Sequence, residues 1–168
     1  PVKASGTYKV KNGTLTIACD AFYNRADLTG VIIPDSVTSI GIMAFEWCDN
    51  LTSVYITDLA AWCDIDFYTE SSNPMYNGAN LYVNNKLLTT VKITDDVKSY
   101  TFNGCNSLKT VTFSKNVTSI GYGAFAKCKS LKSIDGLVIP EDFEYSIQIF
   151  DAIVDSTNIN MFKNKKRK

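Results

Sequence analysis

One pattern of residues recurs along this chain at a fixed spacing. The stretches VTSIGIMAFEWCDNLTSVYI (37–56) and VTSIGYGAFAKCKSLKSI (117–134) share Val-Thr-Ser-Ile-Gly, Ala-Phe, Cys and Leu at matching positions. The phenylalanine of the motif is repeated after 23 residues in both halves of the chain, at Phe22 and Phe45 and again at Phe102 and Phe125. Such periodicity predicts a solenoid, in which each unit buries its apolar face only against its neighbours.

Each unit combines a short strand, a polar turn, a second extended piece and a compact Ala-Phe turn. Leu51, Val54 and Ile56 have the offsets of three and five residues that are typical of a leucine-rich strand. We therefore expect an α/β repeat solenoid, a leucine-rich-repeat-like right-handed stack of about four 23-residue units with one elaborated insert coil. The units are placed at residues 14–36, 37–57, 94–116 and 117–140.

The insert occupies residues 58–93 and is expected to continue the solenoid. Asp58 can act as the N-cap of a helical turn that places Leu59, Trp62 and Cys63 on one side. Further on, LYVNNKLLTTVKI predicts a hairpin, because its Asn-Asn dipeptide tolerates the positive φ angles of a tight turn. Residues 1–168 are accordingly interpreted as a single domain.

The C-terminal region departs from the repeat. Residues 141–162 stay apolar at intervals, which suits either a cap over the last coil or the start of another domain. The basic tail 163–168 contains five of the 17 basic residues, so the rest of the chain has 12 basic and 17 acidic residues. An acidic body does not suit nucleic-acid binding, which needs Lys and Arg spread over a face.

The composition is that of an ordered globular protein, with 45% hydrophobic and 20% charged residues. No apolar run approaches the roughly 20 residues that a membrane span needs, and no signal peptide is recognisable. Because the chain begins at Pro1, we expect it to be a segment of a longer polypeptide.

The sequence contains no histidine, which excludes histidine-dependent hydrolase and zinc sites from this segment. Two carboxylate pairs, Asp64 with Asp66 and Asp95 with Asp96, are candidates for acid–base chemistry or calcium binding. Their polar surroundings favour a solvated surface instead. The prediction is therefore a protein without enzymatic activity, metal or cofactor.

The five cysteines offer a second set of candidate ligands. Cys48, Cys105 and Cys128 share one repeat position, three residues after the phenylalanine, and no Cys-x-x-Cys is present. A small apolar side chain is expected to pack there, so buried free thiols are favoured over a disulfide or a metal site, both of which stay open.

These motifs resemble the BspA-type leucine-rich repeats of bacterial, and some protozoan, surface proteins. Residues 17–57 and 97–140 carry the resemblance. Three departures occur: Arg25 replaces the cysteine of the first unit, the third unit is three residues short, and Asp135-Gly136 displaces the apolar run of the fourth. The resemblance implies surface display and adhesion to proteins or other cells.

A protein that binds through this fold would use outward strand positions, which alternate with the buried ones. The candidate contact residues, on two parallel columns, are Ser53, Tyr55, Thr110, Thr112, Ser133 and Asp135. An ordinary solvated sheet face would carry similar residues. The insert holds further aromatic candidates, for which core packing is the favoured role: Trp62, Phe67, Tyr68, Tyr76 and Tyr82.

The sequence thus favours a non-catalytic protein- or glycan-binding module of a bacterial cell-surface or secreted protein, with adhesion as its activity. Its expected location is extracellular or on the cell surface. The expected partner is a host extracellular-matrix or surface protein, or another bacterial surface, with no nucleic acid and no direct membrane insertion of this segment. Two alternatives stay open: a passive structural spacer, and an accessory repeat region of a larger surface enzyme.

Overall fold

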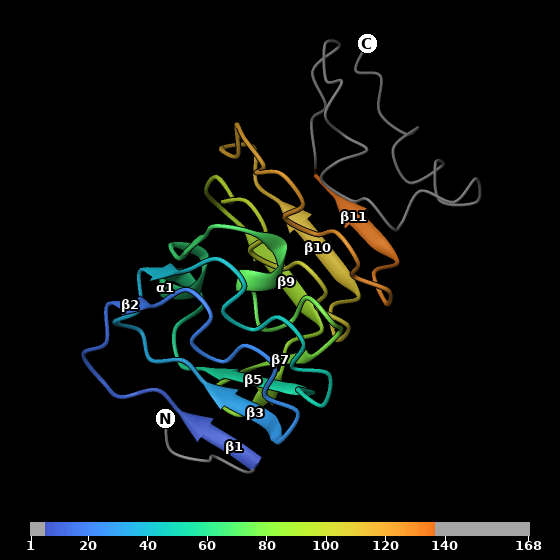
Figure 1. The fold of residues 1–168 in the computed structure, drawn as a ribbon. Helices are drawn as coiled ribbons and strands as arrows, with labels where there is room; N and C mark the ends of the chain where they lie inside the picture. The colour runs from blue at the N-terminus through green and yellow to red at the C-terminus, as the bar shows by residue number, and fades with distance from the viewer. Residues whose placement is uncertain (1–5, 137–168) are drawn as a thin grey trace, which may run out of the picture.

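The computed structural model describes residues 6–136, which form three sheets of short strands (Figure 1). Sheet A has the strand order β1 (Gly6–Lys9), β3 (Leu28–Ile32), β5 (Ser53–Ile56), β7 (Asn80–Val83) and β8 (Lys86–Leu87). Sheet B contains β2 (Thr16–Ile17), β4 (Ser39–Ile40) and β6 (Asp66–Phe67). Sheet C contains β9 (Thr90–Ile93), β10 (Thr110–Phe113) and β11 (Ser133–Asp135). The predicted cap 141–162 and basic tail 163–168 lie outside the described residues.

The strands pair in the register that the 23-residue step predicts. Val31 of β3 lies opposite Val54 of β5, and Val111 of β10 lies opposite Ile134 of β11, in each case in a parallel pair. The inward residue of each pair is buried, whereas its neighbours in β5, β10 and β11 are at least partly exposed. The repeat therefore acts as a stacking register between coils, as expected.

The phenylalanines of the motif stack on one another inside the coil turns. Phe22 and Phe45 lie 4.9 Å apart at 9°, and Phe102 and Phe125 lie 5.2 Å apart at 11°. All four are buried. The column is nevertheless interrupted by the insert, where Ser72, fully buried, occupies the phenylalanine position. The hydrogen-bond ladder identifies this register, because the Phe45 N–H donates to Ser71 O just as the Phe22 N–H donates to Ala44 O.

Each Ala-Phe turn is bounded by two left-handed backbone positions, two residues before and two residues after the phenylalanine. The four pairs are Asp20 and Asn24, Met43 and Trp47, Tyr100 and Gly104, and Gly123 and Lys127, with φ between +55° and +74°. Asp, Asn and Gly tolerate this region, whereas bulkier residues adopt it only when the surrounding structure enforces it. The regular backbone ladder between coils supplies that constraint here.

The insert begins with the predicted helical turn, α1 (Leu59–Cys63). The Asp58 carboxylate accepts hydrogen bonds from Ala60 N and Ala61 N at 2.8 and 3.3 Å, which confirms its role as N-cap. Trp62 is buried and donates from Nε1 to Thr101 O at 3.0 Å. The turn thereby fastens the insert coil to the coil that follows it.

A side chain also replaces the backbone ladder where the short 3₁₀ helix Glu70–Ser72 ends. Asn73 donates from Nδ2 to Tyr100 O at 2.7 Å and to Thr101 O at 3.1 Å. Gly104 lies against the same junction, where a Cβ atom would collide with the Met75 carbonyl oxygen. Close backbone contact therefore requires glycine at position 104.

The predicted hairpin is present and ends sheet A. β7 pairs in parallel with β5, and β8 then turns back antiparallel through Asn84 and Asn85, at φ +49° and +59°. The next strand, β9, begins sheet C. In Figure 1, β1, β3, β5 and β7 stack at one end of the molecule and β9, β10 and β11 at the other.

The expected count of four units is too low, since the solenoid has about six coils. Strand β1 pairs with β3 ahead of the first predicted unit, and the insert adds its own parallel strands β6 and β7. These coils escaped the motif because backbone pairing does not require the Leu and Phe signature. Buried residues from Val10 to Ile134 form one hydrophobic cluster across both stacks.

Replacing Phe102 with Ala should lower the free energy of unfolding by about 3–5 kcal/mol, because it leaves a cavity beneath the Phe125 ring. Thermal or chemical denaturation measures the change. Tyr68→Ala, at a side chain that is 65% exposed, is the control and should cost less than about 0.5 kcal/mol. Equal effects of the two substitutions would contradict the stacked arrangement.

Candidate binding face

The outward residues of sheet A form two columns across the coils. One column runs through Lys9, Ile32, Tyr55 and Tyr82, and the other through Thr7, Gly30, Ser53 and Asn80. Two of the predicted contact residues, Ser53 and Tyr55, lie side by side in these columns on β5. Both are partly exposed.

The other four predicted contact residues lie on sheet C. Thr110 and Ser133 are directly opposite each other, as are Thr112 and Asp135. Strand β9 extends both columns with Thr90 and Lys92. Because the parallel ladder of sheet A ends at the β8 hairpin, the structure brings the six residues together as two separate groups.

Tyr82 is the most notable residue that sequence reasoning left out of the face. Its ring stacks on Tyr55 with centroids 4.9 Å apart and 22° between the planes. The spacing from Tyr55 to Tyr82 is 27 residues, so the 23-residue step misses it. An alignment of NLYV with SVYI, which matches the inward Leu81 to Val54, would have found it.

The two groups differ in chemistry. On sheet A, the Tyr55–Tyr82 pair offers a wide aromatic surface with two phenol hydroxyls beside it. On sheet C the face is smaller and more polar, with Lys92, Thr112 and Asp135 in one row. Ser133 Oγ donates to Asp135 Oδ2 at 3.0 Å, which orients that carboxylate.

The aromatic residues of the insert do not form a single cluster. Trp62 and Phe67 are buried with ring centroids 5.2 Å apart, and Tyr68 is exposed. The Tyr76 hydroxyl accepts a hydrogen bond from the Trp47 N–H at 2.8 Å. Core packing, the favoured role, therefore holds for Trp62 and Phe67, whereas the three tyrosines lie at three different places.

The comparison with family models decides the relationship. A model described as the BspA type leucine rich repeat region matches residues 9–74 and 75–166, with six copies. The chain belongs to this BspA-type family. The six copies agree with the coils counted in the structure. No curated protein matches the chain.

Three solved structures are similar to this BspA-type chain, each with a TM-score below 0.5. A leucine rich repeat protein of T. pallidum is 17% identical, with a TM-score of 0.34 over 78% of this chain and 79% of that one. A leucine rich cell surface protein of Faecalibacterium prausnitzii is 20% identical, with a TM-score of 0.35 over 78% of this chain and 47% of that one. A leucine-rich repeat protein of Eubacterium ventriosum is 15% identical, with a TM-score of 0.24 over 77% and 59%. The family assignment rests on the family model.

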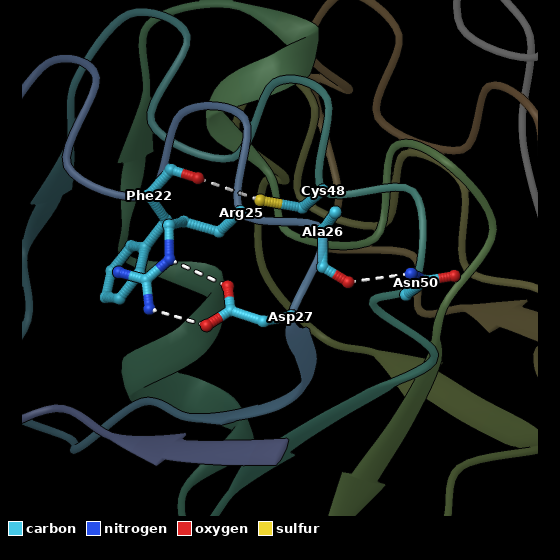
Figure 2. A network of polar contacts seen from close by, with 6 residues as sticks. All are labelled: Phe22, Arg25, Ala26, Asp27, Cys48 and Asn50. Atoms are coloured by element: carbon cyan, nitrogen blue, oxygen red, sulfur yellow. Dashed lines mark hydrogen bonds and ion pairs between the residues drawn. The ribbon is translucent and has the colours of Figure 1, made fainter. Parts of the chain in front are cut away.

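The cysteine of the BspA-type motif has a structural role between coils. Figure 2 shows Cys48 donating from Sγ to the Phe22 carbonyl oxygen at 3.0 Å. Cys128 makes the same contact with Phe102 O, also at 3.0 Å, whereas the Cys105 thiol lies 3.4 Å from the Ser107 hydroxyl. Each repeat cysteine is buried and free, as predicted.

Arg25, at the cysteine position of the first unit, interacts within its own coil. Its Nε and Nη2 atoms donate to the two Asp27 carboxylate oxygens at 2.9 and 3.1 Å (Figure 2). Nearby, Asn50 Nδ2 donates to Ala26 O at 2.7 Å and ties the second coil to the first. This departure from the motif therefore keeps the turn ordered by a different interaction.

Burial makes most of these thiols poor nucleophiles. It raises the pKa of the Cys48, Cys105 and Cys128 thiols above its ordinary value. It also raises the pKa of Cys63 to about 12. Since the thiolate is the reactive form, burial lowers the reactivity of these four side chains at neutral pH.

Asp96, one of the predicted carboxylate candidates, serves the fold. Asp96 accepts hydrogen bonds from Thr118 N at 2.7 Å and from Ser119 N at 2.9 Å. In the first two coils a backbone carbonyl, Leu15 O, receives the equivalent pair of N–H groups. The carboxylate therefore replaces a carbonyl that the third unit, three residues short, does not provide.

The other carboxylates are also engaged or dispersed. Asp66 forms an ion pair with Lys98, with 2.8 Å between Oδ1 and Nζ, and Asp95 accepts from the Thr94 hydroxyl at 2.9 Å. Within residues 6–136, no group of three or more potential His, Cys, Asp or Glu ligands could hold a metal ion. No helix in that range is long and apolar enough to cross a membrane.

The Asp96 contacts predict a pH dependence of stability. Hydrogen bonds from the Thr118 and Ser119 backbone lower the pKa of Asp96 from 3.8 to about 2. The native state thus favours the carboxylate, and this contribution is present above pH 4 and is lost as the pH falls through 2. Unfolding curves between pH 5 and 2 should show a smaller loss of stability for Asp96→Ala than for the parent. Identical slopes for the two proteins would contradict the assignment.

The free thiols give a second prediction. A thiol reagent should modify the exposed Cys19 rapidly, while Cys48, Cys105 and Cys128 should react only as the protein unfolds. Peptide mapping by mass spectrometry identifies the modified residues. Reductant should leave the melting temperature unchanged, and a marked drop would reveal a disulfide.

Proposed function

We propose that this chain is a non-catalytic binding module that contacts a surface macromolecule through the outward faces of sheets A and C. The observation that supports the proposal is the register of outward Tyr, Ser and Thr residues on neighbouring coils. A partner that extends along the solenoid axis would meet equivalent side chains at each strand spacing, about 4.8 Å.

Sheet A is the stronger contact surface of the two. Tyrosine offers a large contact area at a low cost in side-chain entropy, and Tyr55 and Tyr82 are already held against each other. Preorganised aromatic side chains lose little freedom on binding. Sheet C adds hydroxyls at Thr110 and Ser133, which can donate to and accept from either a peptide or a glycan.

The chemistry of the chain favours binding over catalysis. The sequence has no histidine, four thiols have raised pKa values, and Asp96 is occupied by backbone hydrogen bonds. Cys48, Cys128 and Asp96 instead bond to neighbouring coils. We therefore propose that the module has no hydrolase or transferase activity of its own.

Membership in the BspA-type family supports a location on the bacterial surface or outside the cell. The partner is then a host extracellular-matrix or surface protein or glycan, or a molecule on another bacterium, and the activity is adhesion. A few coils present a limited area, so binding by this segment alone should be weak and should strengthen when copies are arrayed.

The proposal predicts that Tyr55→Ala weakens binding at least several-fold. The ligand is taken from a panel of purified matrix proteins and surface glycans screened on the immobilised protein. Loss of the stack with Tyr82 should lower stability by about 1 kcal/mol. Tyr122→Ala is the control, because it also breaks a tyrosine–tyrosine contact, the edge-to-face contact with Tyr100 at 5.6 Å.

The second variant, Thr112→Lys, tests sheet C in the same assay, where a bulky cation beside Lys92 should disfavour a bound partner. If neither variant changes the affinity for a ligand that the parent binds, while Tyr68→Ala does, the sheet faces are scaffold and the insert carries recognition. If nothing in the panel binds, the adhesion proposal fails.

A further inference from the structure

Sheet B is interrupted at the junction between the two stacks. Its last strand is β6. In the coil after β6, the corresponding position is Val97, which among the described residues pairs only with Ile120 of the next coil. An open groove of about 560 Å³ lies between these two segments. Phe67, Val97 and Ile120 line it together with polar groups.

The β6 side of the groove presents unpaired strand edge. The N–H groups of Asp66 and Tyr68 donate back to Thr38 O and Ile40 O of the preceding coil. Because successive peptide groups of a strand point to opposite sides, the N–H and C=O of the intervening Phe67 face the groove.

The opposite wall has the complementary arrangement. Val97 N donates to Ser119 O, and Val97 O accepts from Gly121 N, at 3.2 and 2.7 Å. Both backbone groups of Val97 therefore point to the following coil, and the same alternation turns Asp96 C=O and Lys98 N–H toward the groove. Each wall thus offers one donor and one acceptor.

A strand that fills this groove would lie about 4.8 Å from each wall, the spacing of paired strands. A long side chain crosses the interval here, since Lys98 Nζ reaches Asp66 Oδ1 at 2.8 Å and Asp64 O at 2.6 Å.

We propose that this groove binds an extended peptide as an additional parallel strand between β6 and the Val97 segment. One residue of the peptide would take the place that Ile40 has between Ile17 and Phe67 in the unbroken part of sheet B. Its neighbours would satisfy the four backbone groups of the two walls. This is strand addition at two edges at once.

The lining defines the chemistry of the peptide. The residue over Phe67, Val97 and Ile120 is aliphatic, as Ile40 is in the intact ladder. A Lys or Arg two residues after it would face a rim that has Asp64 and Asp66 as well as Lys98. Asp96 is already held by the Thr118 and Ser119 N–H groups. The partner is therefore an extended, basic segment with an apolar centre.

The probe is the acetylated and amidated peptide KVTSIGK, in which residues 37–41 of this chain carry a lysine at each end. Titration into the ¹⁵N-labelled protein should give saturable shifts, with slowed hydrogen exchange at the Phe67 and Lys98 amides. In the proposed pairing, the isoleucine N–H of the peptide donates to Asp96 O. The same peptide N-methylated at isoleucine cannot make this hydrogen bond and should bind at least about tenfold more weakly.

Ser99→Tyr places a large side chain in the groove and should reduce peptide affinity by a similar factor. The substitution suits the fold, because Tyr122 occupies the same register position one coil later. Cys19→Tyr, at this position in the first coil, is the matched control and should bind the peptide normally.

Three results would each overturn the inference: no saturable shift at Phe67 and Lys98, equal binding of the N-methylated peptide, or unchanged affinity of Ser99→Tyr. Peptide shifts confined to sheets A and C would also overturn it, while leaving the proposed function of those faces untouched. The two proposals can therefore fail separately.

Discussion

Stacking of each coil on its neighbour is the constraint on which the rest of this structure depends. A single coil has too little apolar surface to bury alone, so its phenylalanine, its inward strand residues and its backbone groups all need the next coil. The Phe22–Phe45 and Phe102–Phe125 contacts and the Cys48 and Cys128 thiol bonds connect the same neighbouring coils. Loss of one coil contact therefore weakens the burial of both partners.

The junction between the stacks shows what happens when backbone pairing cannot continue. The β8 hairpin ends sheet A, and side chains replace the missing ladder bonds elsewhere around the coil. Asn73 and Trp62 both donate to Thr101 O, Asp96 accepts the N–H groups of the next coil, and Lys98 crosses to Asp66. On the sheet B side, side chains replace only some of the missing backbone hydrogen bonds, and a groove with two strand edges is left.

This arrangement separates two kinds of surface on one small module. The outward faces of sheets A and C are formed by side chains at regular strand positions, so their chemistry follows the sequence of each coil. The junction groove is formed by backbone groups, whose recognition depends on the direction and spacing of strands. A binding protein built this way can meet side chains on one surface and an extended backbone on the other.

The sequence by itself determined the features that depend on residues at fixed spacing. The 23-residue step gave the register of Val31 with Val54, the buried phenylalanines, the free thiols and the outward position of all six candidate contact residues, because in-register stacking repeats each environment. Local rules were enough for the Asp58 cap and the Asn84-Asn85 turn. Only the tertiary structure decided the division of the face into two groups, the Tyr55–Tyr82 stack and the role of Asp96. Those features depend on backbone pairing between coils of unequal length, which a fixed 23-residue step does not describe.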